Sequence, residues 1–282
     1  MSTINKRKNA RQSSSADVCQ SRKNPRTAGV KKGARRMADV SPELKAELER
    51  GTAQTATLVE GLSIDFAVLL QTVFPDAGDA VHTAMDSAAR EGIIRRMVLA
   101  GTLLWSRYGM EGVARCRLHT SDTVRGWGCF MLGAQSMPLA KRLDAIRPFA
   151  DDPHFGVREW AWLAVRPHLA AELGASIMAL SEWTQSSSAY IRRFACESLR
   201  PRGVWCAHIN ALKQAPEQAL PVLEPLAADP VVYVQDSVAN WLNDAAKHQP
   251  DWVKAVCVRW QAQYPEGAAT RRICTRALRS LK

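Results

Sequence analysis

The chain has 282 residues, a hydrophobic content of 46% and a formal net charge of +11, and this length suffices for one large or two small domains with a sizeable core. No run of about 18 apolar residues occurs, so we expect no membrane span. The seven cysteines stand singly and form no CxxC pair. We therefore expect reduced thiols, with no disulfide framework, metal site or cofactor.

The first 36 residues hold most of the charge. They contain eleven Lys and Arg against one acidic residue, Asp17, a net charge of +10 that leaves +1 for the rest. They are rich in Ser and show no apolar period, so we predict a disordered basic tail over residues 1–36. No apolar segment follows the charges, which argues against a secretory signal and for a cytoplasmic location. Two interpretations stay open, a nucleic-acid-binding arm and translation that starts at Met37.

Residues 37–282 are predicted to form one folded domain. It opens with a helix, because Ser41 is a good N-cap and Pro42 suits the first helical position. Farther along, Asp-Pro pairs at 151–153 and 228–230 are expected to cap helices that start at the proline. We find no convincing strand pattern.

Five stretches of the chain resemble one another. Each carries an anchor residue, and the anchors are 33, 34, 43 and 36 residues apart. Amphipathic segments lie between them, so each unit is predicted to be a helix, a turn and a helix. Such pairs bury their apolar faces only by stacking, which predicts an all-α solenoid of HEAT type. The anchors are Arg125, Arg158, Arg192, Gln235 and Arg271.

The anchor arginines have two possible roles. An Asp stands six residues before the anchor in two units, Asp152 before Arg158 and Asp229 before Gln235. One interpretation is a structural ladder, in which each Asp accepts a hydrogen bond from the Arg of a neighbouring repeat. The alternative is contact with phosphate.

Repeat register places three carboxylates on one helix face. Counted from their own anchors, Glu159 stands at +1, Glu197 at +5 and Asp244 at +9. Steps of four residues keep a side chain on one face while moving it one turn along the axis. Successive repeats are therefore predicted to present a diagonal row of acids on the concave face. At positions +8 and +9 from the anchor, two earlier repeats have Arg-Pro, and we expect these prolines to end their helices.

The aromatic residues divide into core and candidate site. Trp127, Trp160 and Phe194 share repeat position +2 and are most simply core. Trp205 follows the helix-breaking stretch "RPRGV" and matches no repeat position. We expect it either in the core or exposed beside the acids.

Three segments resemble a known family, the DNA alkylation repair proteins with HEAT-like repeats, on the AlkC side of the AlkC/AlkD superfamily. They are "VREWAWLAVRP", "RRFACESLRPRGVW" and "SVANWLNDAAKHQPDWV", and the resemblance runs from about residue 45 to the C-terminus. It implies a DNA glycosylase that removes cationic bases such as 3-methyladenine and 3-methylcytosine from duplex DNA without flipping them. It maps the catalytic acids to Glu197, Asp244 and Glu159, and an aromatic contact to Trp205.

The remaining expectations follow from this resemblance. The carboxylates would stabilise an oxocarbenium-like sugar and position water. Trp160 and Trp241 are candidates for substrate contact beside Trp205, and we expect a monomer that binds DNA through its concave face. Some relatives carry an immunoglobulin-like domain that touches DNA, and we expect those contacts to be missing here. The expected DNA-binding residues are Arg166, Arg192, Arg193, Arg200 and Arg202.

Two other classes of function stay open. One is a HEAT-repeat protein that binds DNA structures without catalysis, and the other is a protein-protein scaffold, the common use of HEAT arrays. A scaffold predicts a hydrophobic or mixed concave face. The DNA-binding classes predict Arg and Lys beside the acids, as the sequence has.

Overall fold

The computed structural model describes residues 33–281. Most of the predicted basic tail, residues 1–32, lies outside this part. Residues 33–36 belong to the described part, where the backbone N–H of Ala34 donates to a carboxylate oxygen of Glu60 (2.7 Å). The first helix begins as predicted, since the Ser41 hydroxyl accepts from the N–H of Leu44 and Pro42 is the first helical residue.

The described residues form helices and no strand, as the sequence predicted. The first four helices are α1 (Pro42–Glu49), α2 (Leu58–Ser63), α3 (Phe66–Val73) and α4 (Asp79–Ser87). The others are α5 (Ile93–Arg117), α6 (Asp122–Gly133), α7 (Leu139–Ala150), α8 (Phe155–Ala171), α9 (Leu173–Trp183), α10 (Ala189–Glu197), α11 (Asn210–Gln214), α12 (Leu220–Leu223), α13 (Val232–Ala246), α14 (Pro250–Gln263) and α15 (Ala268–Ala277). Short 3-10 turns are Met37–Asp39, Pro75–Ala77, Pro216–Ala219, Glu224–Leu226 and Arg279–Leu281.

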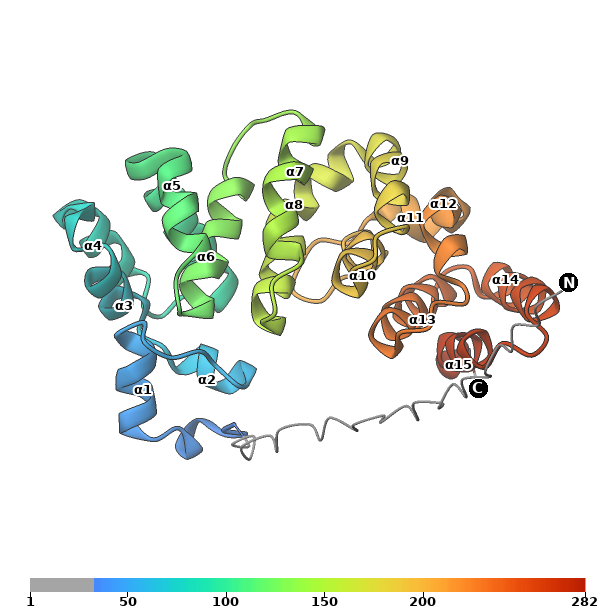
Figure 1. The fold of residues 1–282 in the computed structure, drawn as a ribbon, viewed down its shortest axis with the longest axis horizontal. Helices are drawn as coiled ribbons and strands as arrows, with labels where there is room; N and C mark the ends of the chain where they lie inside the picture. The colour runs from blue at the N-terminus through green and yellow to red at the C-terminus, as the bar shows by residue number, and fades with distance from the viewer. Residues whose placement is uncertain (1–32, 282) are drawn as a thin grey trace, which may run out of the picture. The chain divides into compact units, whose positions relative to one another are not determined.

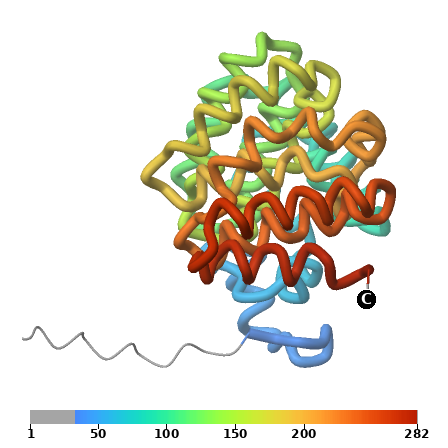
Figure 2. The backbone as a smooth tube through the Cα atoms, turned by 90° about the vertical axis from the view of Figure 1, so that its right-hand side faces the viewer, coloured from blue at the N-terminus to red at the C-terminus, as the bar shows by residue number. Residues whose placement is uncertain are grey.

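Within residues 33–281 the helices stack as a solenoid of pairs (Figure 1). The inner helices α6, α8, α10, α13 and α15 follow one another in one row, and each packs on the next. The outer helices α5, α7, α9, α12 and α14 form a second row behind them, and Figure 2 shows the last pair, α14 and α15, side by side. Every inner helix carries one of the five predicted repeat motifs, so the repeat prediction is confirmed.

The anchor residues explain why each repeat closes in the same way. Each is the fourth residue of its inner helix, and its side chain donates back to a carbonyl six residues earlier. Arg125, for example, donates to the carbonyl of His119 (2.9 Å). The same bond joins Arg158 to Asp152, Arg192 to Ser186, Gln235 to Asp229 and Arg271 to Pro265. An anchor thus supplies donors to turn carbonyls that have no partner within a helix.

The predicted ladder is present at two steps. Arg125 Nε donates to Asp152 Oδ2 at 2.8 Å, and Arg192 Nε donates to Asp229 Oδ2 at 2.6 Å. In both pairs the Asp precedes the next inner helix, so each pair joins two repeats. Arg158 instead lies over the ring of Tyr190, with its guanidinium carbon 4.0 Å from the centroid.

Two local predictions were wrong. The Asp-Pro pairs do not start helices, since α8 begins at Phe155 and α13 at Val232. Their carboxylates instead accept from the backbone two residues on, as Asp152 does from His154 (2.7 Å) and Asp229 from Val231 (2.9 Å). Pro167 does not end its helix either, because α8 continues to Ala171.

The core runs between the two rows. Trp127 and Phe194, predicted as core, are buried, whereas Trp160 is partly exposed. Gly133 lets α6 approach α8, because a Cβ there would lie 2.5 Å from the carbonyl oxygen of Ala164. In the described part of the chain, no helix combines the length and the apolar character that crossing a membrane requires.

Candidate active site on the inner helices

Five charged side chains form a continuous row along the inner helices. Glu159 comes from the second turn of α8, and Arg193 and Glu197 come from α10. Arg200 follows the end of α10, and Asp244 lies in the last turn of α13. Carboxylates and guanidinium groups alternate along this row, which we call the acid–arginine row.

The contacts within the row are short. Arg193 Nη2 lies 2.7 Å from Glu159 Oε1 and 3.6 Å from Glu197 Oε2. Arg200 Nη1 lies 2.7 Å from Glu197 Oε1, and its Nη2 lies 2.8 Å from Asp244 Oδ2. The three predicted acids therefore belong to one site, but two arginines join them, which the spacing alone did not indicate.

Two of the three carboxylates in the row are buried. Glu197 is 3% exposed and Asp244 is 5% exposed. Burial raises the pKa of Glu197, but the charges of Arg193 and Arg200 and a hydrogen bond from Ser237 outweigh it and lower the pKa below its ordinary value. The row begins and ends with a carboxylate, so with all groups ionised it carries a net charge of −1. Lys247 approaches its far end, 3.7 Å from Asp244 Oδ1.

An aromatic groove lies beside the first acid of the row. Its volume is about 260 Å³, and Glu159 lines it together with residues of α2, α8 and the loop after α10. Glu159 is the carboxylate of the row that reaches this groove, and its Oε2 accepts a hydrogen bond from Trp162 Nε1 (2.8 Å). The apolar and aromatic lining is Leu58, Phe155, Trp160, Trp162, Leu163, Val204 and Trp205.

Trp205 is the exposed wall of the groove. Its side chain is 53% exposed, and its backbone φ of 61° is a left-handed conformation that bulky residues rarely adopt. Among residues 33–281 no other non-glycine residue has a positive φ. A strained backbone of this kind costs about 1–3 kcal/mol and persists only where the surroundings hold it.

Arg166 of α8 provides that support. It is 2% exposed, and its guanidinium donates to the carbonyls of Ser198 (2.7 Å), Arg200 (2.6 Å) and Ala207 (3.3 Å). These carbonyls belong to both ends of the loop that carries Trp205. The predicted DNA contact is therefore wrong for Arg166, whose donors are used inside the protein.

Two more side chains that were predicted to contact substrate or DNA also have their donors bound inside the protein. Trp241 is fully buried, and its Nε1 donates to the carbonyl of Leu199 (2.9 Å), so the structure contradicts a substrate contact. Arg192 is bound to Asp229 and to turn carbonyls, which places it in the ladder rather than on a free surface. Arg202, unlike Arg166, is partly exposed, and its Nη1 lies 3.1 Å from His248 Nε2.

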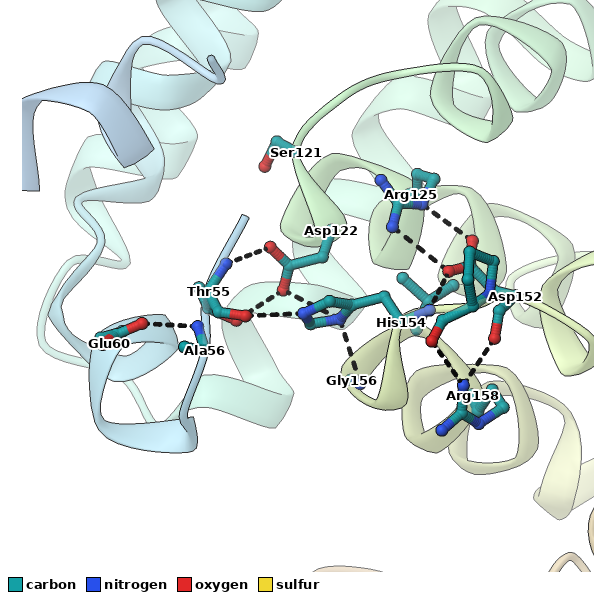
Figure 3. A network of polar contacts seen from close by, with 12 residues as sticks. Thr55, Ala56, Glu60, Ser121, Asp122, Arg125, Asp152, His154, Gly156 and Arg158 are labelled. Atoms are coloured by element: carbon teal, nitrogen blue, oxygen red, sulfur yellow. Dashed lines mark hydrogen bonds and ion pairs between the residues drawn. The ribbon is translucent and has the colours of Figure 1, made fainter. Parts of the chain in front are cut away.

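The groove wall on the N-terminal side is α2, which a separate polar network holds in place (Figure 3). Asp122 of α6 accepts from the Thr55 backbone (2.9 Å) and from the Thr55 hydroxyl (2.8 Å). Nε2 of His154 lies 2.7 Å from the carbonyl oxygen of Thr55, and its Nδ1 accepts a hydrogen bond from the N–H of Gly156 (3.2 Å). Glu60 accepts from Ala56 (2.5 Å) within the same segment. These bonds fix Leu58 opposite α8.

Sequence reasoning missed two cationic groups beside Asp244. Lys247 comes from the end of α13 and Arg279 follows α15, and the neutral ring of His208, from the loop after α10, also lies near Asp244. The Arg279 guanidinium is bonded to Asn240 (2.9 Å). Their positions in sequence share no repeat register, so the spacing of the repeats held no signal for them.

Comparison with known proteins finds a family model that matches the part of the chain holding this site. Residues 150–268 match the family described as DNA alkylation repair enzyme, a range that includes the whole acid–arginine row and Trp205. The structure of Pseudomonas fluorescens alkylpurine DNA glycosylase AlkC, bound to DNA containing an abasic site analog, is similar over 86% of this chain. Its TM-score is 0.63 and its sequence identity 25%, and the similarity covers 65% of that chain.

Two further proteins are similar to parts of the chain. AlkD2 from Streptococcus mutans has a TM-score of 0.47 at 23% identity, over 73% of this chain and 88% of its own. "Uncharacterized protein YhaZ" of Bacillus subtilis (strain 168) is 40% identical over 102 residues, or 36% of this chain. That segment is 29% of the length of the Bacillus protein.

Proposed function

We propose that the protein is a DNA glycosylase that excises cationic N3-alkylated bases from duplex DNA, since residues 150–268 match the family described as DNA alkylation repair enzyme. The substrates we propose are 3-methyladenine and 3-methylcytosine. The observation that carries the proposal is the net negative acid–arginine row beside an aromatic groove. Both features suit a substrate that carries positive charge.

The proposed reaction needs little acid catalysis. An N3-alkylated base is already cationic, so when the bond from C1′ to the base nitrogen breaks, the electron pair neutralises the base. The positive charge passes to the sugar, which becomes oxocarbenium-like. Water then adds to C1′ and loses a proton. The enzyme must therefore stabilise a cation, hold the water and accept one proton.

We propose that Glu159 positions the water that adds to C1′. It is the acid that lines the groove, and its fixed bonds to Arg193 and Trp162 orient the carboxylate. A carboxylate about 4 Å from the developing charge contributes about 4 kcal/mol at most, at an effective dielectric constant of about 20. That is roughly a thousandfold in rate.

Glu197 and Asp244 act from behind the groove in this proposal. They are buried and paired with arginines, so they supply the excess negative charge and fix Arg193 and Arg200. Trp205 and Trp160 offer aromatic faces, and an aromatic face over a cation adds about 0.5–2 kcal/mol. The duplex lies along the inner helices, bent, with the damaged base left in the stack.

One assay tests the proposal. Purified protein is incubated with duplexes that contain 3-methyladenine or 3-methylcytosine, and the free base is measured by chromatography. We expect release from both, and strong loss of release in Glu197→Gln. Duplex binding without base release would instead favour the non-catalytic DNA-binding class. Failure to bind duplex DNA at all would leave the protein-protein scaffold.

A further inference from the structure

Five cationic or titratable side chains gather at the Asp244 end of the acid–arginine row. They come from the loop after α10, from α11 and from the end of α13. His208, Lys247 and His248 are exposed, and the other two are partly exposed. We call this group the basic cluster, and its members are Arg202, His208, Lys213, Lys247 and His248.

Three hydrogen bonds hold the parts of the basic cluster together. Gln249, which follows α13, donates from its side chain to the carbonyl of Gln214 in α11 (2.9 Å). The N–H of Ile209 donates to the carbonyl of Pro201, which closes the loop after α10 (3.1 Å). Arg202 Nη1 and His248 Nε2 lie 3.1 Å apart. Since a guanidinium can only donate, His248 accepts here and its Nε2 is unprotonated.

Negative charge near the basic cluster is scarce. The acid that faces it is Asp244, which is 5% exposed and already bound by Arg200. The pKa of both histidines lies below the ordinary value because of desolvation and the charges of Lys213 and Arg202. The charged or titratable groups that face them are Arg166, Arg202, Lys213, Lys247, Asp244 and the other histidine of the pair.

We propose that the basic cluster is a proton-linked binding site for phosphates of the DNA backbone, a proposal that rests on DNA being the partner. A phosphate supplies the missing anion and relieves the repulsion among the cations. It also favours the charged form of each histidine, which gives up its role as acceptor and becomes a donor. Phosphate binding is therefore coupled to uptake of protons by His208 and His248.

The position of the basic cluster fits this role. Lys247 contacts Asp244, so the cluster continues the acid–arginine row without a gap. The row repels phosphate and the cluster attracts it, which holds the DNA backbone at the Asp244 end of the row, while the groove lies at the Glu159 end. Phosphate contacts of this kind set the register of a protein on the duplex without reading bases.

The direction of the pH effect follows from the pKa of the two histidines in the free protein and in the complex. In the free protein both histidines have a pKa below 6.5 and are neutral at neutral pH. In the complex the nearby phosphate raises their pKa. Affinity is therefore lowest above the pKa of the bound form, and it rises as pH falls toward the pKa of the free form.

The test is binding of the whole protein to a fluorescent, undamaged duplex, measured by anisotropy at fixed salt from about pH 8 to about pH 6. We expect the wild-type affinity to rise by about tenfold over this range, as an average uptake of roughly half a proton on binding produces. The double variant His208→Gln/His248→Gln is expected to lose most of that rise. His82→Gln, on α4 and outside the basic cluster, is the matched control and keeps it.

Two results would overturn the inference. One is a wild-type affinity that does not depend on pH, and the other is a double variant with the full wild-type rise. Base release from damaged duplex, measured on the same preparations, tests the glycosylase proposal separately. A protein that binds with the expected pH dependence but releases no base keeps the basic cluster and loses the catalytic assignment.

Discussion

Replacing Glu159 by Gln is the sharpest test of the acid–arginine row. Glutamine keeps the length of the side chain, but its one oxygen can accept from either Trp162 Nε1 or Arg193 Nη2, which bond to different oxygens of Glu159. The net charge of the row changes from −1 to zero. A unit charge between about 4 and 7 Å from the reacting sugar contributes about 2–4 kcal/mol at an effective dielectric constant of about 20.

This range corresponds to a rate loss of about 30- to 1000-fold. The assay is single-turnover release of 3-methyladenine with enzyme in excess, and affinity for undamaged duplex is measured beside it. Glu182→Gln on the outer helix α9 makes the same chemical change far from the row and serves as the control. If Glu159→Gln releases base within about threefold of wild type, the groove-facing carboxylate has no role in the reaction.

Three further outcomes are expected, two from the buried contacts of Asp244 and Glu197 and one from the charge of the N-terminal residues. Asp244→Asn removes a buried partner of Arg200, so we expect the free energy of unfolding to fall by about 3 kcal/mol in urea titrations; an unchanged midpoint would contradict the buried pairing. The lowered pKa of Glu197 means that its ionised form stabilises the fold above its ordinary pKa, and that this contribution is lost as pH falls through the folded pKa. Urea unfolding between about pH 7 and about pH 3 should therefore show a smaller acid-induced loss in Glu197→Gln than in wild type, and equal losses would refute the shift. Deleting residues 1–32, which hold nine Lys and Arg, should weaken duplex binding and flatten the plot of log affinity against log salt while lesion preference stays the same; an unchanged salt slope would show that the tail does not contact DNA.

The repeats could be predicted from the sequence because their cause is local. Each anchor bonds to its own turn five or six residues back, so the same residue recurs wherever the same turn is built. The register of Glu159, Glu197 and Asp244 on one face follows from the same regularity. What the period fixes is the direction of a side chain, and all three acids do lie along one row of helices.

The sequence pattern could not predict how deeply a side chain is buried or which residues it contacts. Trp241 stands three residues before Asp244 in the sequence but is fully buried, where it donates to the carbonyl of Leu199 and lies against the ring of Trp252. Arg166 looked like a phosphate contact, yet it crosses to the next repeat and binds carbonyls there. Such contacts join residues about 30 to 40 positions apart, and the repeat spacing gives no rule for which side chain crosses. Pro167 was read as a helix end, although α8 runs on past it.

The bonds between anchors and their own turns have a consequence for variation of the chain. The longest repeat spacing, from Arg192 to Gln235, includes the loop that carries Trp205. The turns before α10 and α13 are closed by their own anchors, and Arg166 holds the two ends of the loop, so the tip between Arg200 and Ala207 can change without altering the spacing of the inner helices. The scaffold and the groove wall are thus separable parts. In the proposed glycosylase, exchanging the tip of this loop alters which lesion is accepted while the row of acids stays where it is.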